Sequence, residues 1–434
     1  MIPATLTRRF PFFLIGLVLL VPGFLLAVGL IQPPYFVAGF AAAVFLAIFM
    51  VNFEAGFLTL IFVRSSLDYF KLLTRGGSFN VAAVAGAFLI LLGIFYILYR
   101  RINIFAYAET RPFLIFLGVC GVSVFFSSNR FESLSDWLRL VSIFFVYVFA
   151  RHVTVDAKKR RSVLFLVLLS AGVPVLVAFI QLFFGVGLRH GRLVGTFYHP
   201  NAFASYLLVI LVFVLAQILE RHSTLPRSLL IPFAGFAFVA FVLTLSRGAW
   251  IVFLFVMGVM GFLRYRRILG WMPALLPLLV FLPGVMGRIK DVTESSYHRG
   301  RSAWQWRLDA WKELVPLIRE KPIFGHGIAM VNVQLGYMAH NDYLRLAVEV
   351  GLVGLLAYIF LMTGLLRLTW RDYQSARSGM GKSIQLGLLA ITLGFLVREI
   401  ADNTLRNTVV LLYFWIFVAM ARNAAIDEAA GREV

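Results

Sequence analysis

The sequence predicts an all-α fold, a polytopic bundle of transmembrane helices. Of the 434 residues, 61% are hydrophobic and only 14% are charged, whereas soluble domains carry about 25% charged residues. The apolar residues form continuous runs that can cross about 30 Å of hydrocarbon as helices, unlike the short alternating segments of a transmembrane barrel. We therefore expect about twelve membrane-spanning helices, and at most fourteen.

The apolar runs that predict these helices are bounded by charged or turn-forming residues. They cover residues 11–31, 35–51, 53–63, 80–99, 112–127, 136–151, 162–184, 201–219, 229–245, 248–263, 269–286, 350–368, 383–398 and 406–422. The third run is too short to cross a membrane alone. The first follows two arginines, but no small-residue cleavage site comes after it, so we expect an uncleaved helix rather than a signal peptide.

Basic residues in alternate loops predict the orientation of the chain, because cytoplasmic loops collect Lys and Arg. These residues cluster near 8–9, 100–111, 158–161, 221–227, 264–267 and 367–382. Both termini are then expected in the cytoplasm. The intervening loops, expected on the outer side, are 64–79, 128–135, 185–200, 246–248, 287–349 and 399–405.

The chain divides into four regions, of which the third interrupts the membrane pattern. They are N-terminal transmembrane helices (1–184), transmembrane helices with an arginine-bearing outer loop (185–286), a large outer loop (287–349), and C-terminal transmembrane helices with a cytoplasmic tail (350–434). In the large loop, Trp304, Leu308, Trp311, Val315 and Ile318 recur at helical spacing. This pattern predicts an amphipathic helix suited to the bilayer interface.

The large loop ends in the strongest candidate site, His340 followed by Asn341, Asp342 and Tyr343. Asn341 or Asp342 is expected to cap a helix that runs on into the next span. The positive end of a helix dipole favours a neutral histidine, which suits a general base. A histidine that only hydrogen-bonds within a loop is the structural alternative. Glu349 is out of phase with His340 on an ideal helix, so we expect it to pair with an arginine or to cap another helix.

A second outer loop holds Arg189 and Arg192 among glycines and leads through His199 and Asn201 into a helix. Because guanidinium groups match phosphate oxygens, these arginines are candidates to bind a phosphate or pyrophosphate; alternatively they extend to lipid headgroups. Arg247 is a candidate for the same anion or for a structural ion pair. Two arginines of the large loop, Arg288 and Arg301, are further candidates.

Several function classes are disfavoured by composition and by missing motifs. The single cysteine, Cys120, excludes an intramolecular disulfide and a cysteine metal cluster. The chain has no HExxH, GxSxG, P-loop or Rossmann motif, and no soluble basic domain for nucleic acid. Acidic residues are sparse in the outer loops, so we expect no metal or other cofactor. The net charge of +20 instead suits anionic lipids or phosphorylated substrates.

Taken in order, these motifs resemble the O-antigen ligase and polymerase superfamily of bacterial envelope glycosyltransferases. The matching segments are residues 192–204, 245–248, 307–311, 321–327 and 340–344, with Glu349 and Gly351. They lie within roughly residues 185–360. The earlier spans match only in their hydrophobic layout.

The resemblance implies a reaction on the periplasmic side of a bacterial inner membrane. A glycan would pass from undecaprenyl pyrophosphate to a hydroxyl, with inversion and without a metal or nucleotide. His340 would be catalytic, and Arg189 or Arg192, together with Arg288, would hold the pyrophosphate. The further phosphate-binding candidates are Arg247 and Arg301, and the supporting candidates are Asn341, Tyr343, Glu349, His199 and Asn201.

Three activities are compatible with that superfamily. A ligase attaches finished O-antigen to lipid A-core, a polymerase joins repeat units, and an O-oligosaccharyltransferase glycosylates protein. We favour the ligase, because its phosphate-rich lipid acceptor suits a basic outer loop and no added domain serves a protein acceptor. A transporter would show polar residues near helix midpoints, whereas here they gather at the outer helix ends.

Overall fold

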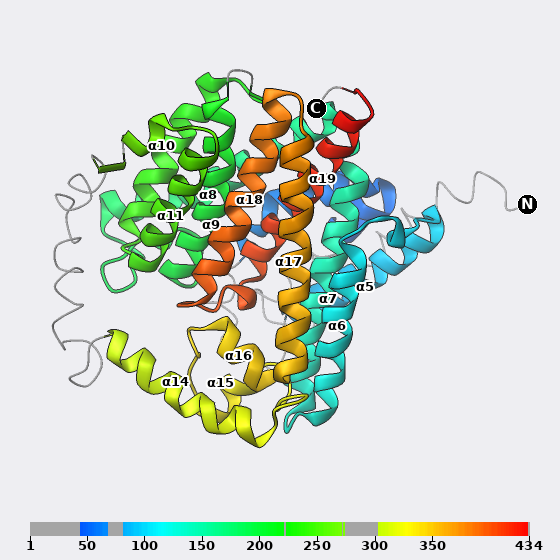
Figure 1. Ribbon diagram of the computed structural model, residues 1–434, viewed down its shortest axis with the longest axis vertical. Helices are drawn as coiled ribbons and strands as arrows, with labels where there is room; N and C mark the ends of the chain where they lie inside the picture. The colour runs from blue at the N-terminus through cyan, green and yellow to red at the C-terminus, as the bar shows by residue number, and fades with distance from the viewer. Residues whose placement is uncertain (1–43, 68–80, 221–222, 271, 274–302, 433–434) are drawn as a thin grey trace, which may run out of the picture. The chain divides into compact units, whose positions relative to one another are not determined.

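The computed structural model describes residues 44–67, 81–220, 223–270, 272–273 and 303–432 (Figure 1). These residues form α-helices and short 3-10 turns without a strand, which confirms the all-α class. The predicted run 11–31 and most of runs 35–51 and 269–286 lie outside the described residues. Arg288 and Arg301 also lie outside them.

The chain forms two compact units, residues 1–65 and 66–434. In the described part of the first unit, residues 44–51 are helical and α3 (Phe53–Arg64) follows. Asn52 separates the two helices and caps α3, because its side-chain oxygen accepts a hydrogen bond of 3.1 Å from the Ala55 N–H. The capping residue thus explains why the apolar sequence is divided here.

The second unit contains the helices that carry the candidate site. They are α5 (Val81–Arg100), α6 (Thr110–Ser123), α7 (Arg130–Val153), α8 (Ala157–Phe184), α9 (Pro200–Leu219), α10 (Arg227–Leu243), α11 (Arg247–Leu263), α14 (Ala303–Glu320), α15 (Met330–Leu335), α16 (Asp342–Glu349), α17 (Gly351–Ser375), α18 (Gly379–Glu399) and α19 (Thr408–Ala429). Short 3-10 turns occur at η2 (Ile104–Ala106), η3 (Val124–Phe126) and η4 (Thr404–Arg406). Every predicted run between residues 80 and 263 and between 350 and 422 is a helix.

Six of the described helices are long and apolar enough to cross a membrane, namely α7, α8, α9, α17, α18 and α19. Shorter apolar helices occur in α5, α6, α10 and α11. The chain is therefore a multi-pass membrane protein. In the second unit α19 is the central helix, since it packs against α7, α9 and α18 and nearly all of its side chains are buried.

Polar contacts join the loops of the second unit at two ends of the bundle. At one end Glu220 pairs with Arg264 at 2.6 Å, and Arg160 pairs with Asp427 at 2.7 Å. At the other end, which we call the site end, the start of α7 contacts the loop after α14, the loop after α8 contacts the loop after α10, and the loop after α18 contacts the start of α16. Among the described residues, the predicted outer loops 128–135, 185–200, 246–248 and 399–405 and the described part of 287–349 lie at the site end. The described basic loops lie at the opposite end.

Helices α14, α15 and α16 pack together at the site end (Figure 1). Their shared core contains Leu314, Val331, Ala339 and Val348, with Trp311, Leu317, Ile318, Leu335 and Leu344 against it. The predicted amphipathic helix is present as α14, but its predicted apolar side is divided. Trp311 and Ile318 face this core, whereas Trp304 is 47% exposed. The division arises because α14 covers α15 and α16 with a face rotated away from Trp304.

The expectation of one continuous helix from His340 into the next span is wrong. The chain breaks between α16 and α17, where Gly351 has φ +74° and a side chain would overlap the Ile323 carbonyl. The segment around Gly325 runs beside the break, and the N–H groups of His326 and Gly327 donate to the Val348 and Glu349 carbonyls at 2.9 Å. These bonds satisfy carbonyls that the end of α16 leaves without helical partners.

Candidate active site

His340 is held in a fixed backbone conformation at the start of α16. Its φ is 49°, in the left-handed region that residues other than glycine rarely adopt. On one side the Ala339 carbonyl accepts a hydrogen bond of 2.9 Å from the Trp311 indole. On the other, Asn341 is the helix cap, and its side chain accepts the Leu344 N–H at 3.0 Å. Strain of this kind is concentrated at functional sites.

Asp402, in the loop after α18, faces His340. Its Oδ1 lies 3.8 Å from Nδ1 of the histidine, and its Oδ2 lies 2.5 Å from the Arg398 guanidinium. Burial favours the protonated carboxyl, but Arg398 and His340 outweigh it and hold the pKa of Asp402 well below its usual range. A charged carboxylate at this distance can stabilise a protonated imidazole.

Arg398, on α18, connects this carboxylate to α9 and α11. Its Nε donates to Ser205 on α9 at 3.1 Å, and Nη2 donates at 3.2 Å to Ser246, which caps α11. The guanidinium lies over Gly248, where a Cβ would be 2.5 Å from Nη1. The Leu245-Ser-Arg-Gly248 motif therefore supplies both a hydroxyl for Arg398 and the space it occupies.

The loop with the second motif folds as a tight hairpin, in which Arg189 and Arg192 exchange two backbone hydrogen bonds of 3.0 and 3.1 Å. Arg192 is buried; its Nε donates to the Thr244 carbonyl at 2.7 Å and its Nη2 to Asn201 at 2.8 Å. Arg189 lies over the Tyr198 ring, 4.2 Å from its centroid, and donates to the Tyr198 carbonyl at 2.5 Å. Both arginines thus have protein partners that fix the loop.

His199 caps α9, and its Nδ1 accepts the Asn201 N–H at 3.1 Å. Burial lowers the pKa of His199 to about 4, with Asp402 opposing and Arg192, His340 and Arg189 reinforcing the shift. The predicted residues His340, His199, Arg189 and Arg192 therefore lie in one electrostatic neighbourhood. His199 is neutral near pH 7.

Arg247 and Arg307 complete the positive side of the site. Arg247 is the first residue of α11 and is half-buried. Burial lowers the pKa of Arg307 on α14; Asp402 acts in the opposite direction, and Arg398 and Arg247 act in the same one. Arg307 thus lies within electrostatic reach of Asp402, Arg398 and Arg247, which come from other elements.

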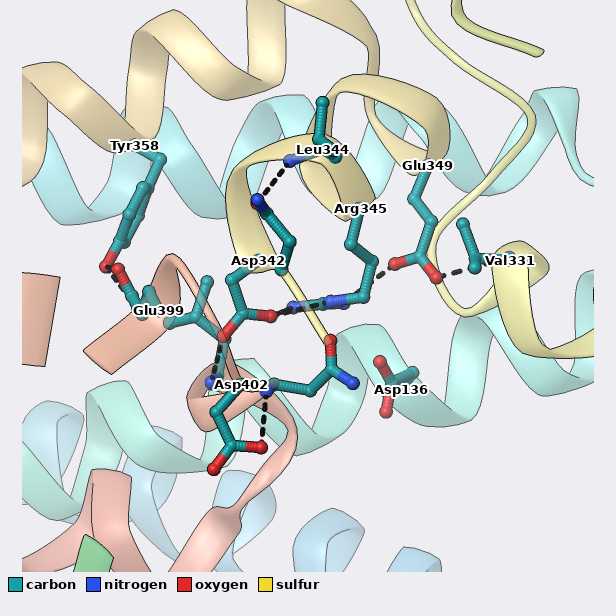
Figure 2. A network of polar contacts seen from close by, with 12 residues as sticks. Asp136, Val331, Asp342, Leu344, Arg345, Glu349, Tyr358, Glu399 and Asp402 are labelled. Carbon is teal, nitrogen blue, oxygen red and sulfur yellow. Dashed lines mark hydrogen bonds and ion pairs between the residues drawn. The ribbon is translucent and has the colours of Figure 1, made fainter. Parts of the chain in front are cut away.

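Asp342, Arg345 and Glu349 of α16 form a buried ion cluster that begins two residues after His340 in the chain (Figure 2). Arg345 lies 2.7 Å from Asp342 and 2.8 Å from Glu349. The Leu405 N–H donates to Asp342 at 2.8 Å, which ties α16 to the loop that carries Asp402. Glu349 pairs with an arginine, one of the two roles that the sequence predicted.

Tyr343 and Glu399 hold α16 and α17 against α18. The Tyr343 hydroxyl donates to the Leu396 carbonyl at 2.8 Å, and Tyr358 donates to Glu399 at 2.6 Å (Figure 2). These contacts fix the scaffold around His340.

Sequence reasoning missed Arg307, Arg398, Asp402 and the Asp342–Arg345 pair. Arg398 and Asp402 stand where an apolar run meets an expected outer loop, so their charge was a usable signal. The inference that acidic residues are sparse outside is corrected, since Asp342, Glu349 and Asp402 converge at the site end. Each of these carboxylates has an arginine partner.

Among the residues that the structure describes, no three His, Cys, Asp or Glu side chains are grouped to hold a metal ion.

Comparison with known families agrees with the motifs. Residues 232–359 match the family model described as O-antigen ligase. The matched segment contains Arg247, Arg307 and His340, together with the Asp342–Arg345 pair. No curated protein matches the chain significantly. Residues 232–359 are therefore similar to the O-antigen ligase family, and the match covers less than a third of the 434-residue chain.

Proposed function

We propose that the protein is an O-antigen ligase, a metal-independent inverting glycosyltransferase. It would move O-antigen glycan from undecaprenyl pyrophosphate to lipid A-core. The match of residues 232–359 to the O-antigen ligase family supports ligase or polymerase chemistry on lipid-linked glycans. The choice of donor, acceptor and ligase activity is our proposal. The observation that carries it is the pairing of His340 with Asp402 at a site end rich in arginine.

The chemistry follows from the two sides of the imidazole. Nδ1 of His340 faces Asp402, which leaves Nε2 to take the proton of the acceptor hydroxyl. The hydroxyl oxygen attacks the anomeric carbon as the bond from that carbon to the pyrophosphate oxygen breaks. The proton goes to His340 and the electron pair leaves with the pyrophosphate, so the sugar is transferred with inversion.

Arginines are suited to the charge that develops on the leaving pyrophosphate. Arg307 and Arg247 come from different helices and lie within electrostatic reach of each other, which favours them as the groups that contact it. Arg189 and Arg192 are engaged by the protein and would act through their remaining N–H groups or by shaping the loop. Arg288 and Arg301 are candidates from the sequence alone.

The location follows from the charge pattern of the loops. With the basic loops in the cytoplasm, the site end faces the periplasm of a bacterial inner membrane, and both termini are cytoplasmic. Membrane lipids and a lipid-linked glycan then reach the site from the outer leaflet.

A lipopolysaccharide gel from a host that lacks this gene tests the proposal. We expect bare lipid A-core, with long glycan accumulating on the polyprenyl carrier. Wild type should restore the ladder, and His340→Asn should not, although it is made and inserted in equal amount.

Other outcomes identify other activities. Core carrying a single repeat unit in the deficient host would identify a polymerase. An unchanged ladder would exclude both and leave protein glycosylation or transport to be examined.

A further inference from the structure

A line of aromatic rings runs from His340 toward α14 and α15. The Trp306 ring lies edge to face with His340, with centroids 5.7 Å apart at 70°. On its other side Trp306 meets Tyr337, with centroids 5.5 Å apart at 63°. The Tyr337 hydroxyl donates to the Glu313 carboxylate. Trp306 and Tyr337 are half-buried and Glu313 is exposed, so the line leads from the histidine to the surface.

Local structure explains how these residues meet. Trp306 and Glu313 are two helical turns apart and share a face of α14. Gly336, with φ +72°, ends α15 and turns the chain so that Tyr337 returns to that face. Tyr337 and His340 lie in the same short connection between α15 and α16.

The two sides of His340 differ in chemistry. On the bundle side Asp402 pairs with Arg398 of α18, and Arg307, which α14 itself supplies, interacts with the same carboxylate. On the α14 side His340 contacts the Trp306 ring, and the Tyr337 ring and the Glu313 carboxylate follow beyond it. A pyrophosphate suits the first side. A neutral sugar suits the second, because the C–H face of a pyranose packs on an aromatic ring and its hydroxyls donate to a carboxylate.

We propose that Trp306, Tyr337 and Glu313 form the subsite for the acceptor sugar. A pyranose bound on these rings has its hydroxyl groups next to His340, across the imidazole from Asp402 and its partner Arg398. This inference rests on the proposed function, since it assigns the acceptor half of the same transfer. Trp306 is the residue that contacts both His340 and Tyr337, so it is the centre of the subsite.

A transfer assay with purified protein tests the subsite by measuring KM separately for the acceptor and for the donor. Trp306→Ala should raise KM for lipid A-core by about tenfold or more, while KM for the lipid-linked glycan changes less than about twofold. Trp306→Phe should recover most of the loss, because it restores a ring. Trp304→Ala is the matched control, since it removes an exposed tryptophan from another face of α14. An equal effect of Trp306→Ala on both KM values, or none, would overturn the subsite.

A binding measurement separates failure of the subsite from failure of the proposed function. Delipidated core oligosaccharide is titrated onto wild type and Trp306→Ala. A parallel titration with one soluble O-antigen repeat unit shows whether the acceptor is core or a growing chain. If wild type transfers nothing but binds either saccharide, and Trp306→Ala does not, the subsite stands while ligation fails. If wild type transfers glycan and Trp306→Ala behaves like wild type in both assays, the subsite is wrong and ligation stands. If wild type binds neither saccharide, the subsite is wrong as well.

Discussion

Nδ1 of His340 lies 3.8 Å from Oδ1 of Asp402, although the two residues come from separate loops on α16 and α18. Arg398 holds the carboxylate from behind, and the Asp342–Leu405 hydrogen bond joins the two loops. Tertiary contacts therefore bring the two residues together, and substitution of Asp402 tests whether the pair serves the proposed reaction.

Asp402→Asn should lower kcat by about 100-fold, because the amide cannot stabilise the imidazolium that forms on proton transfer. KM for the glycan donor should change little. The control is Asp309→Asn, which makes the same carboxylate-to-amide change at an exposed position on α14. Equal activity of Asp402→Asn and wild type would remove the carboxylate from the mechanism.

The left-handed backbone of His340 predicts how substitutions there affect folding. His340→Asn should unfold at nearly the temperature of wild type, since Asn tolerates this conformation, whereas His340→Val should lose about 1–3 kcal/mol more. Thermal unfolding of the purified proteins measures the difference. Equal stability of the two variants would contradict the assigned backbone conformation.

Gly248→Ala should impair activity more than folding. The added methyl group occupies the position of the Arg398 guanidinium, which can move because it ends a flexible side chain, but then releases Asp402. We expect kcat to fall about tenfold or more with little change in melting temperature. Gly235→Ala, where a Cβ meets nothing within 4 Å, is the control. A variant as active as wild type would show that the position of Arg398 does not matter.

Arg345→Met should destabilise the protein by about 3–5 kcal/mol, because it leaves Asp342 and Glu349 buried without their cation. The comparison is Lys312→Met, which removes an exposed partner of Asp309 at 3.5 Å and should cost at most about 1 kcal/mol. Chemical unfolding gives both values. A small effect of Arg345→Met would mean that the cluster is hydrated or rearranges.

The pKa of His199 predicts a pH dependence of stability. Its folded value of about 4 lies below the ordinary value of about 6.5, so the unfolded chain binds more protons between those values. Stability should therefore fall as the pH drops below 6.5, by about 1–2 kcal/mol at pH 5. His199→Asn should remove this part of the loss while keeping a cap for α9. An unchanged pH dependence in the variant would show that His199 is not buried as described.

The spans and the core of the candidate site were predictable from sequence. Apolar runs fix helices because each must bury its backbone polar groups in lipid, and α7 to α11 and α17 to α19 follow them closely. His340, Asn341 and Arg192 stood out because polar residues at helix ends are costly unless they have a role.

The rest depended on tertiary contacts. Asp402 and Arg398 become site residues only when α18 packs beside α9 and α11, which no local pattern specifies. The break at Gly351 depends on the approach of the Ile323 backbone, from a segment well separated in sequence. The divided apolar face of α14 likewise reflects its packing on α15 and α16.

The most direct test of the account is a single-turnover transfer assay with purified protein, lipid-linked glycan and lipid A-core, in the presence of a chelator. We predict that wild type transfers the glycan and that His340→Asn, folded and able to bind the lipid-linked glycan, is slower by about 100-fold or more. Transfer by His340→Asn at the wild-type rate would contradict the central role of His340.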